Sequence, residues 1–240
     1  MKKLQALIIG IFTILIFGAA TANAVTWTVT KSTNGNDNVC DADCSLREAV
    51  FNADSGDTVN FSSSLVGQTI TLGGSEIVIT KRITIDGHLN DPNVAFISGS
   101  NTSRIFYIQP GGGLDLRNMT LVQGSGESSP GNPGNNVSVA SGGAIIAFSG
   151  SALSLDRVAV RGNTAKFGGG IHLGNGTHHI TNSSLTTNSA ESGTAINQVN
   201  GGSLLMSNTT VSGNYLSADN QQTVGCGAIC TRSVELFPLG

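Results

Sequence analysis

The chain has 240 residues, with 12 Lys and Arg against 15 Asp and Glu, and its formal net charge is −3. Nucleic-acid-binding domains of the usual kind carry a basic excess, so this balance excludes that class and no nucleic-acid partner is expected. Glycine fills 32 positions and aromatic residues only 5%, while the hydrophobic fraction of 39% exceeds that of a disordered chain. The composition predicts a folded, turn-rich β protein.

Residues 1–24 have the pattern of a secretory signal peptide. Two lysines precede an apolar run at 4–20, and Ala22 and Ala24 form an A-x-A cleavage motif. We predict cleavage between Ala24 and Val25, which leaves an exported protein without a transmembrane span. Its expected location is extracellular, at the cell surface, associated with the outer membrane, or periplasmic. The alternative is an uncleaved N-terminal anchor.

The four cysteines form two closely spaced pairs, Cys40 with Cys44 and Cys226 with Cys230. An oxidising compartment favours disulfides over free thiols. Three pairings are possible, and the two local ones are favoured. A zinc site is the weaker alternative, because neither pair has C-x-x-C spacing.

A short helix is expected after the first cysteine pair. Ser45 and Glu48 have the spacing of a capping box, which predicts a helix from Leu46 to about Ala53. Its apolar residues fall on one face, as a helix covering the end of a β structure requires. We interpret residues 25–56 as an N-terminal cap.

The next four segments are short and rich in residues that favour β structure, so we expect each of them to form a β strand. They are Thr58–Phe61, Thr69–Leu72, Ile77–Ile79 and Ile83–Gly87.

The middle of the chain repeats. Four blocks align, Leu116–Leu121, Leu155–Val160, Ile180–Leu185 and Met206–Val211, with offsets of 39, 25 and 26 residues. The longer first interval contains a Gly- and Pro-rich insertion at 123–139. Repeats of this length predict a solenoid.

Within a repeat, apolar residues alternate and then slip by one, as at Leu153, Leu155, Val158 and Val160. This pattern indicates two strands joined by a bend. A coil that advances one strand spacing every 25 or so residues is a parallel β-helix. We predict an all-β, single-stranded parallel β-helix over residues 57–230, of six or seven rungs, where a rung is one turn of the coil.

One further position recurs three residues after each block, occupied by Gly124, Asn163, Asn188 and Asn214. Glycine and asparagine adopt the left-handed backbone region most cheaply. We interpret these four as structural turn residues in that region.

Together these segments resemble a known family. The run Cys40–Ala49 followed by Gly56–Thr58 resembles the CSLREA domain of exported bacterial proteins of the pectin-lyase-like class, and Gly142–Ile145 resembles polymorphic outer-membrane protein repeats. The resemblance implies a right-handed coil and an exported or surface location. Such folds host lyases, hydrolases and adhesins alike, so the resemblance selects no activity.

The last ten residues, 231–240, do not continue the repeat, although family members are usually longer. Two interpretations stay open. The tail caps the coil with its apolar residues, or the reading frame is truncated and its product inactive.

A catalytic set for acidic polysaccharides is not evident. Within 114–230 the acidic residues occupy different repeat positions and do not stack; they are Asp115, Glu127, Asp156, Glu191 and Asp219. Calcium binding or two-carboxylate hydrolysis needs converging acids. The motifs of polygalacturonases are also missing. No cofactor is predicted, and calcium is expected only if the protein is a lyase.

One cluster of basic residues is the alternative candidate for glycan contact. Arg157, Arg161, Lys166 and His172 fall within one repeat, so they could form one flank or be separate solvated charges. The neighbouring His178 and His179 should point to opposite faces of a strand, which disfavours a zinc pair, and we interpret His178 as exposed.

Several Asn-x-Ser/Thr sequons are best explained by the repeat itself. Asn118, Asn182 and Asn208 share one repeat position, so the turn chemistry of the rung generates their sequons.

The expected function is noncatalytic binding of a polysaccharide or cell-surface component, as in adhesin-like proteins. The alternative is a polysaccharide lyase or glycoside hydrolase acting on an acidic glycan. The sequence indicates neither the ligand nor the oligomeric state.

Overall fold

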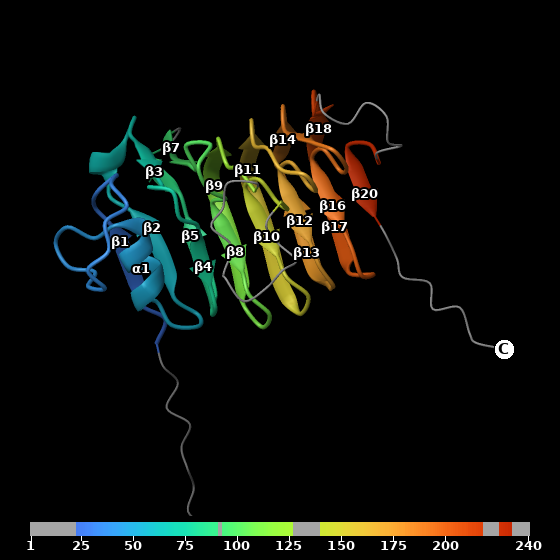
Figure 1. Cartoon of the computed structure of the whole chain (residues 1–240). Coiled ribbons are helices and arrows are strands. Elements are labelled where there is room, and N and C mark those ends of the chain that lie inside the picture. Colours follow the sequence, from blue (N-terminus) through green and yellow to red (C-terminus); the bar gives the residue numbers. More distant parts are fainter. Residues whose placement is uncertain (1–22, 91–92, 127–139, 218–225, 232–240) are drawn as a thin grey trace, which may run out of the picture.

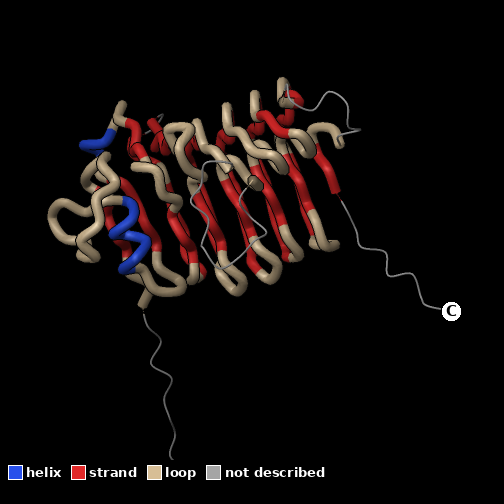
Figure 2. Tube along the Cα trace, viewed as in Figure 1, coloured by secondary structure: helices blue, strands red, loops and turns tan. Residues whose placement is uncertain are grey.

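The computed structural model describes residues 23–90, 93–126, 140–217 and 226–231. Figure 1 shows a stack of strands whose colours follow the chain from one end of the body to the other, with helix α1 (Leu46–Asn52) at the N-terminal end. Strands lie on opposite sides of the body with loops between them (Figure 2). Each rung therefore packs mainly against the rungs before and after it in sequence.

The first and largest sheet runs the length of the coil. Its main path is β1 (Thr26–Val29), β2 (Thr58–Phe61), β5 (Arg82–Asp86), β9 (Gly113–Val122), β11 (Ser151–Arg161), β13 (Gly176–Thr181) and β17 (Ser203–Ser207). The strands β3 (Thr69–Thr71), β7 (Asn93–Ser98), β14 (Ser184–Thr186) and β18 (Thr210–Ser212) pair with one another or with the second halves of β9 and β11.

The second sheet lies on another side of the coil. Its order is β4 (Ile77–Ile79), β8 (Phe106–Ile108), β10 (Ile145–Ala147), β12 (Ile171–Leu173), β16 (Ile196–Gln198) and β20 (Ile229–Thr231). The remaining elements are short: the 3-10 helix η1 (Ser63–Leu65) and the strands β6 (His88–Asn90), β15 (Ser189–Ala190) and β19 (Tyr215–Leu216).

The predicted parallel β-helix is confirmed. Strand pairs are parallel throughout both large sheets, and the small β6–β7 ladder is antiparallel. The predicted alignment is also the observed register, because Leu116, Leu155, Ile180 and Met206 are partners in successive strands. A period of 25 or 26 residues returns the chain to the same face, so like residues stack inside the coil.

The bend within each repeat is built on left-handed residues. Asn118, Arg157, Asn182 and Asn208 have φ between 47° and 55°. At this bend two consecutive side chains point away from the core. The alternation of inward and outward residues is therefore shifted by one residue after the bend. The predicted pair of strands is present as β13 with β14 and as β17 with β18, whereas β9 and β11 each run through the bend as one strand. Asparagine suits three of the four bends.

The interpretation of Gly124, Asn163, Asn188 and Asn214 as left-handed residues is wrong, since none of them has a positive φ. The three asparagines instead form a ladder. The side-chain oxygen of Asn163 accepts from the Gly124 backbone nitrogen at 2.8 Å. Asn188 and Asn214 repeat this contact one and two rungs further along. Asparagine recurs here because its amide satisfies backbone groups inside a tight turn.

The N-terminal end of the coil is covered by helix α1. Helix α1 packs against β1, β2 and β4, with Leu46, Ala49 and Ala53 fully buried. The capping box is present: Ser45 accepts from the Glu48 backbone nitrogen, and Glu48 accepts from that of Ser45. Buried apolar residues thus cover the first rung.

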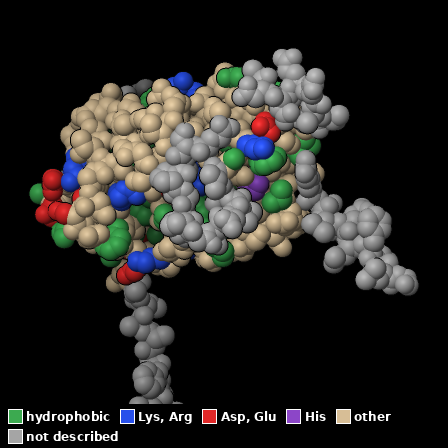
Figure 3. All heavy atoms as spheres, viewed as in Figure 1, with side chains coloured by type: hydrophobic (Ala, Val, Ile, Leu, Met, Phe, Trp, Pro, Cys, Tyr) green, Lys and Arg blue, Asp and Glu red, His purple; other side chains and the backbone are tan. Residues whose placement is uncertain are grey.

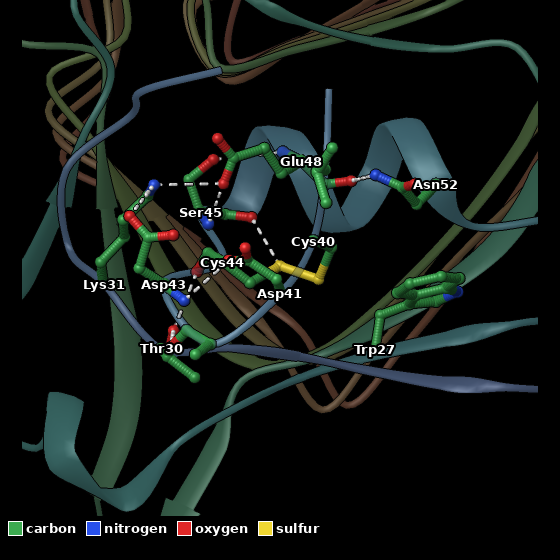
Figure 4. Close-up of a disulfide and its surroundings, with 12 residues drawn as sticks. Trp27, Thr30, Lys31, Cys40, Asp41, Asp43, Cys44, Ser45, Glu48 and Asn52 are labelled. Carbon is green, nitrogen blue, oxygen red and sulfur yellow. Dashed lines mark hydrogen bonds and ion pairs between the residues drawn. A yellow bond between two sulfur atoms is a disulfide. The ribbon is translucent and has the colours of Figure 1, made fainter. Parts of the chain in front are cut away.

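A disulfide joins Cys40 to Cys44 beside this helix, and a second joins Cys226 to Cys230. Figure 4 shows the first disulfide next to the capping box, with Lys31 placed between Asp43 and Glu48. Both local pairings expected from the sequence are therefore present. Among the described residues, no helix has the length and apolar character that crossing a membrane requires.

Candidate functional site

A shallow groove of about 750 Å³ lies on the outer face of the first sheet. It crosses four neighbouring strands, β5, β9, β11 and β13, and includes the turns at Gly150 and Asn175. Because the groove runs across the strands, it presents side chains from successive rungs about 4.8 Å apart.

Strand alternation decides which side chains line the groove. Every second residue points out of the coil, and the parallel register aligns these residues into rows. One row consists of Thr84, Asp115, Ser154 and His179 in consecutive strands. These groups supply hydroxyl, carboxylate and imidazole functions along one line, as the recognition of a hydroxyl-rich ligand requires.

The adjacent row begins with Arg82 and continues with small residues, which form the floor of the groove. Gly113 pairs with Ala152, which pairs with Thr177. Arg82 is the first member of this row, and its side chain lies across Gly113: a Cβ on that glycine would stand 2.9 Å from Arg82 Cγ. Glycine at this position therefore allows the arginine to lie flat along the floor.

The Arg82 guanidinium is exposed, and it has no hydrogen bond or ion pair to any residue in the described part of the chain. A planar guanidinium presents donors that match a carboxylate or sulfate. It is thus the group in the groove best suited to an anionic substituent.

Asp115 is already engaged. It forms an ion pair with Arg117 at the edge of the groove. This hydrogen bond and the Asp115 charge, together with the charges of Asp86 and Asp156, hold the pKa of Arg117 above its ordinary value. Asp86 and Asp156 are the register partners of Arg117 in the strands on either side. The three acids therefore surround one cation.

The described residues contain no group of three His, Cys, Asp or Glu side chains arranged to hold a metal ion. Asp115 is also the one carboxylate that lines the groove. General acid–base chemistry on a glycosidic bond uses two opposed carboxyl groups. The arrangement as it stands is suited to binding.

The four basic residues considered as a possible glycan-contact flank are spread over different elements of one rung. Arg157 donates to Asn118 and pairs with Asp156 in the row of bends. Arg161, at the end of β11, lies 6.0 Å from the centroid of the Phe96 ring. Both belong to the first sheet.

The other two members of that predicted flank lie further along the same rung. Lys166 pairs with Glu191 at 3.8 Å in the loop after β11. His172 is on β12 of the second sheet, where its Nδ1 lies 3.0 Å from the Asn197 amide nitrogen. Since a rung turns through several faces, nearness in sequence does not give a common flank. On the face seen in Figure 3, charged side chains are scattered among uncharged ones.

The expectation that His178 is exposed is wrong. Its side chain points into the coil and is fully buried, in the row that contains Leu153 and Leu204. Burial lowers the pKa of His178, which keeps the imidazole neutral. His179 points outward into the groove, so the expected opposition of the two histidines holds.

Sequence reasoning assigned none of the residues that line the groove to a binding site, and it did not single out Arg82. Arg82 precedes the regular repeats, and β5 and β9 are separated by 31 residues in register instead of 25 or 26. The alternation within Arg82–Asp86 is the sequence feature that could have revealed that Arg82 points outward.

Comparison with known proteins finds no matching family model, no matching curated protein and no matching solved structure. The fold of this chain, a parallel β-helix with an N-terminal helix, therefore rests on its own sheet topology.

Proposed function

We propose that the chain is an exported, noncatalytic β-helix protein that binds a glycan in the groove over β5, β9, β11 and β13. We also place its N-terminal cap, on the resemblance of residues 40–58, with the CSLREA domains of pectin-lyase-like proteins. That resemblance supports export and a surface location.

One observation carries the proposal: an exposed guanidinium, without a partner among the described residues, lies on a floor of small residues beside a straight row of polar side chains. Arg82 provides the charge, and Ser154 and His179 provide hydroxyl and imidazole groups for hydrogen bonds. These groups stand on strands of a rigid sheet, so little ordering entropy opposes binding. Arg82 favours a glycan that carries carboxylate or sulfate groups.

The test uses purified residues 25–240 with both disulfides intact. Retention is measured on arrays and on insoluble glycans, with neutral, carboxylated and sulfated members in each set. We expect retention on an anionic glycan, weakened at least tenfold in R82A and less in H179A, because a charge-assisted contact is worth more than a neutral one. R161A is the matched control, because Arg161 is an exposed arginine outside the groove.

The same samples are followed for unsaturated products and new reducing ends, with and without calcium. Turnover that R82A abolishes would replace the binding role with a lyase or hydrolase. Retention equal in R82A and wild type would refute the groove as the binding site.

A further inference from the structure

A buried carboxylate holds the residue at which the signal peptide is predicted to end. Asp57 is 5% exposed, and its Oδ1 accepts a hydrogen bond from the Val25 backbone nitrogen at 2.8 Å. Its Oδ2 accepts from Trp27 Nε1 at 3.1 Å and from the Asp54 backbone nitrogen at 2.8 Å. Each oxygen thus has at least one donor, and one of these donors is the nitrogen of the bond whose cleavage is predicted.

We propose that Asp57 is a binding site for the new N-terminal ammonium of Val25, so that removal of the signal peptide completes the N-terminal cap with an ion pair. This inference is independent of glycan binding. It rests on the predicted cleavage between Ala24 and Val25, which the experiment below tests first.

The chemistry of the cleavage supplies the charge. Hydrolysis of the Ala24–Val25 amide consumes one water molecule. The carboxylate leaves on Ala24, and the amine that remains on Val25 takes up a proton near neutral pH, because α-amino groups titrate near 8. The hydrogen bond from a neutral amide to the carboxylate thereby becomes an ion pair in which both the donor and the acceptor are charged.

The surroundings of Asp57 favour the ionised carboxylate. Hydrogen bonds from the backbone nitrogens of Asp54 and Val25 lower the pKa of Asp57, whereas burial acts to raise it. The hydrogen bond from Trp27 and the charge of Lys81 lower the pKa further. Lys81 itself pairs with the exposed Asp54 at 3.0 Å. The carboxylate is therefore charged and ready before the ammonium exists.

The position of Val25 makes docking possible without rearrangement. Its carbonyl oxygen accepts from the Thr58 backbone nitrogen at 2.9 Å, in continuation of the β1–β2 pairing. Asn23 and Ala24, by contrast, are exposed and belong to no strand. The nitrogen of Val25 thus stays beside Asp57 when the preceding residues are removed, and the ion pair fixes the first strand of the coil.

The experiment begins with N-terminal sequencing of the exported chain, which is expected to start at Val25. Three forms of the mature protein are then compared: free Val25, Nα-acetylated Val25, and a chain that retains Ala24. Acetylation keeps an N–H donor and removes the charge. We expect the acetylated and extended forms to unfold with an equilibrium constant about tenfold larger and a Tm lower by about 3 °C.

A second readout does not depend on stability. The pKa of the Val25 α-amino group, followed by NMR or by its rate of acylation, is expected to lie at least one unit above the ordinary value of about 8, and to return to it in D57N. D54N is the matched control, because it removes a neighbouring exposed carboxylate while keeping the backbone donor to Asp57. In D54N the effect of acetylation should persist.

Three outcomes would overturn the proposal: an exported chain that begins elsewhere, equal stability of the free and acetylated forms, or an ordinary α-amino pKa. If D57N fails to fold, the comparison of free with acetylated wild-type chains still decides. None of these readouts involves glycan, so failure here and failure of the proposed function are distinguishable.

Discussion

The side-chain oxygen of Asn188 accepts two hydrogen bonds from Asn163, one from its backbone nitrogen at 3.1 Å and one from its side-chain nitrogen at 3.0 Å. Asn188 in turn donates to the Val160 carbonyl at 2.9 Å and to Asn214. A single fully buried amide therefore satisfies groups in both neighbouring rungs.

We expect N188A to destabilise the protein by about 2–4 kcal/mol, because it leaves several buried donors and acceptors without partners. Denaturant unfolding of the mature chain measures the change. N175A is the control, since Asn175 is exposed in a turn and no side-chain bond of it is seen in the described residues. Equal losses in the two variants would contradict the structural role of the ladder.

The bend at Arg157 offers a stabilising substitution. Arg157 has φ 55°, where the neighbouring rungs have asparagine, and its contacts with Asn118 and Asp156 are on the surface. We expect R157N to raise stability by about 0.5–1 kcal/mol, because asparagine tolerates the left-handed region better and surface ion pairs contribute little. R161N, on the same strand but without a positive φ, should give no gain. A loss of stability in R157N would show that the arginine contacts outweigh the backbone strain.

The stability of the coil should fall in mild acid because of His172. Burial, with a further contribution from the charge of Arg104, lowers the pKa of His172 to about 4. The unfolded chain, with an imidazole pKa near 6.5, binds the proton more readily than the folded protein does. The stability that the neutral, buried imidazole contributes is therefore complete above pH 6.5 and is lost as the pH falls towards 4. The expected loss is on the order of 2–3 kcal/mol.

Urea unfolding between pH 7.5 and 4 checks this expectation. H172Q should flatten the pH dependence. The buried His178 contributes in the same direction, so a residual slope is expected in H172Q. An identical slope in H172Q and wild type would be evidence against the assignment.

Gly113 allows a test of the groove that leaves Arg82 in the chain. The three atoms nearest to the Cβ of G113A would all belong to the Arg82 side chain, which can move, so we expect the guanidinium to leave the floor of the groove. Glycan retention should then fall as far as in R82A, with stability changed by less than about 0.5 kcal/mol.

G176A provides the contrast, because a Cβ at Gly176 would stand 2.2 Å from the Ser151 carbonyl oxygen, a backbone atom. That variant should lose stability. Unimpaired retention in a well-folded G113A variant would separate Arg82 from glycan binding.

Local pattern explains which parts of the fold were predictable. The aligned blocks starting at Leu116, Leu155, Ile180 and Met206 gave the register of four successive strands. The spacing of Ser45 and Glu48 predicted the start of α1. These features depend on the chain nearby and on a period that the sequence displays directly, so the sequence by itself determined the coil, its rungs and its capping helix.

Only the tertiary structure decided what each polar residue does. Asn163 and His178 lie inside the coil because they share rows with inward-facing residues, whereas sequence reasoning had placed one in a left-handed turn and the other on the surface. Arg82 and His179 come to one groove across strands that are far apart in the chain, while Arg161 and His172, eleven positions apart, face different sides. A solenoid brings together residues one rung apart and separates those within a rung, and this is why the site required the coil to be built first.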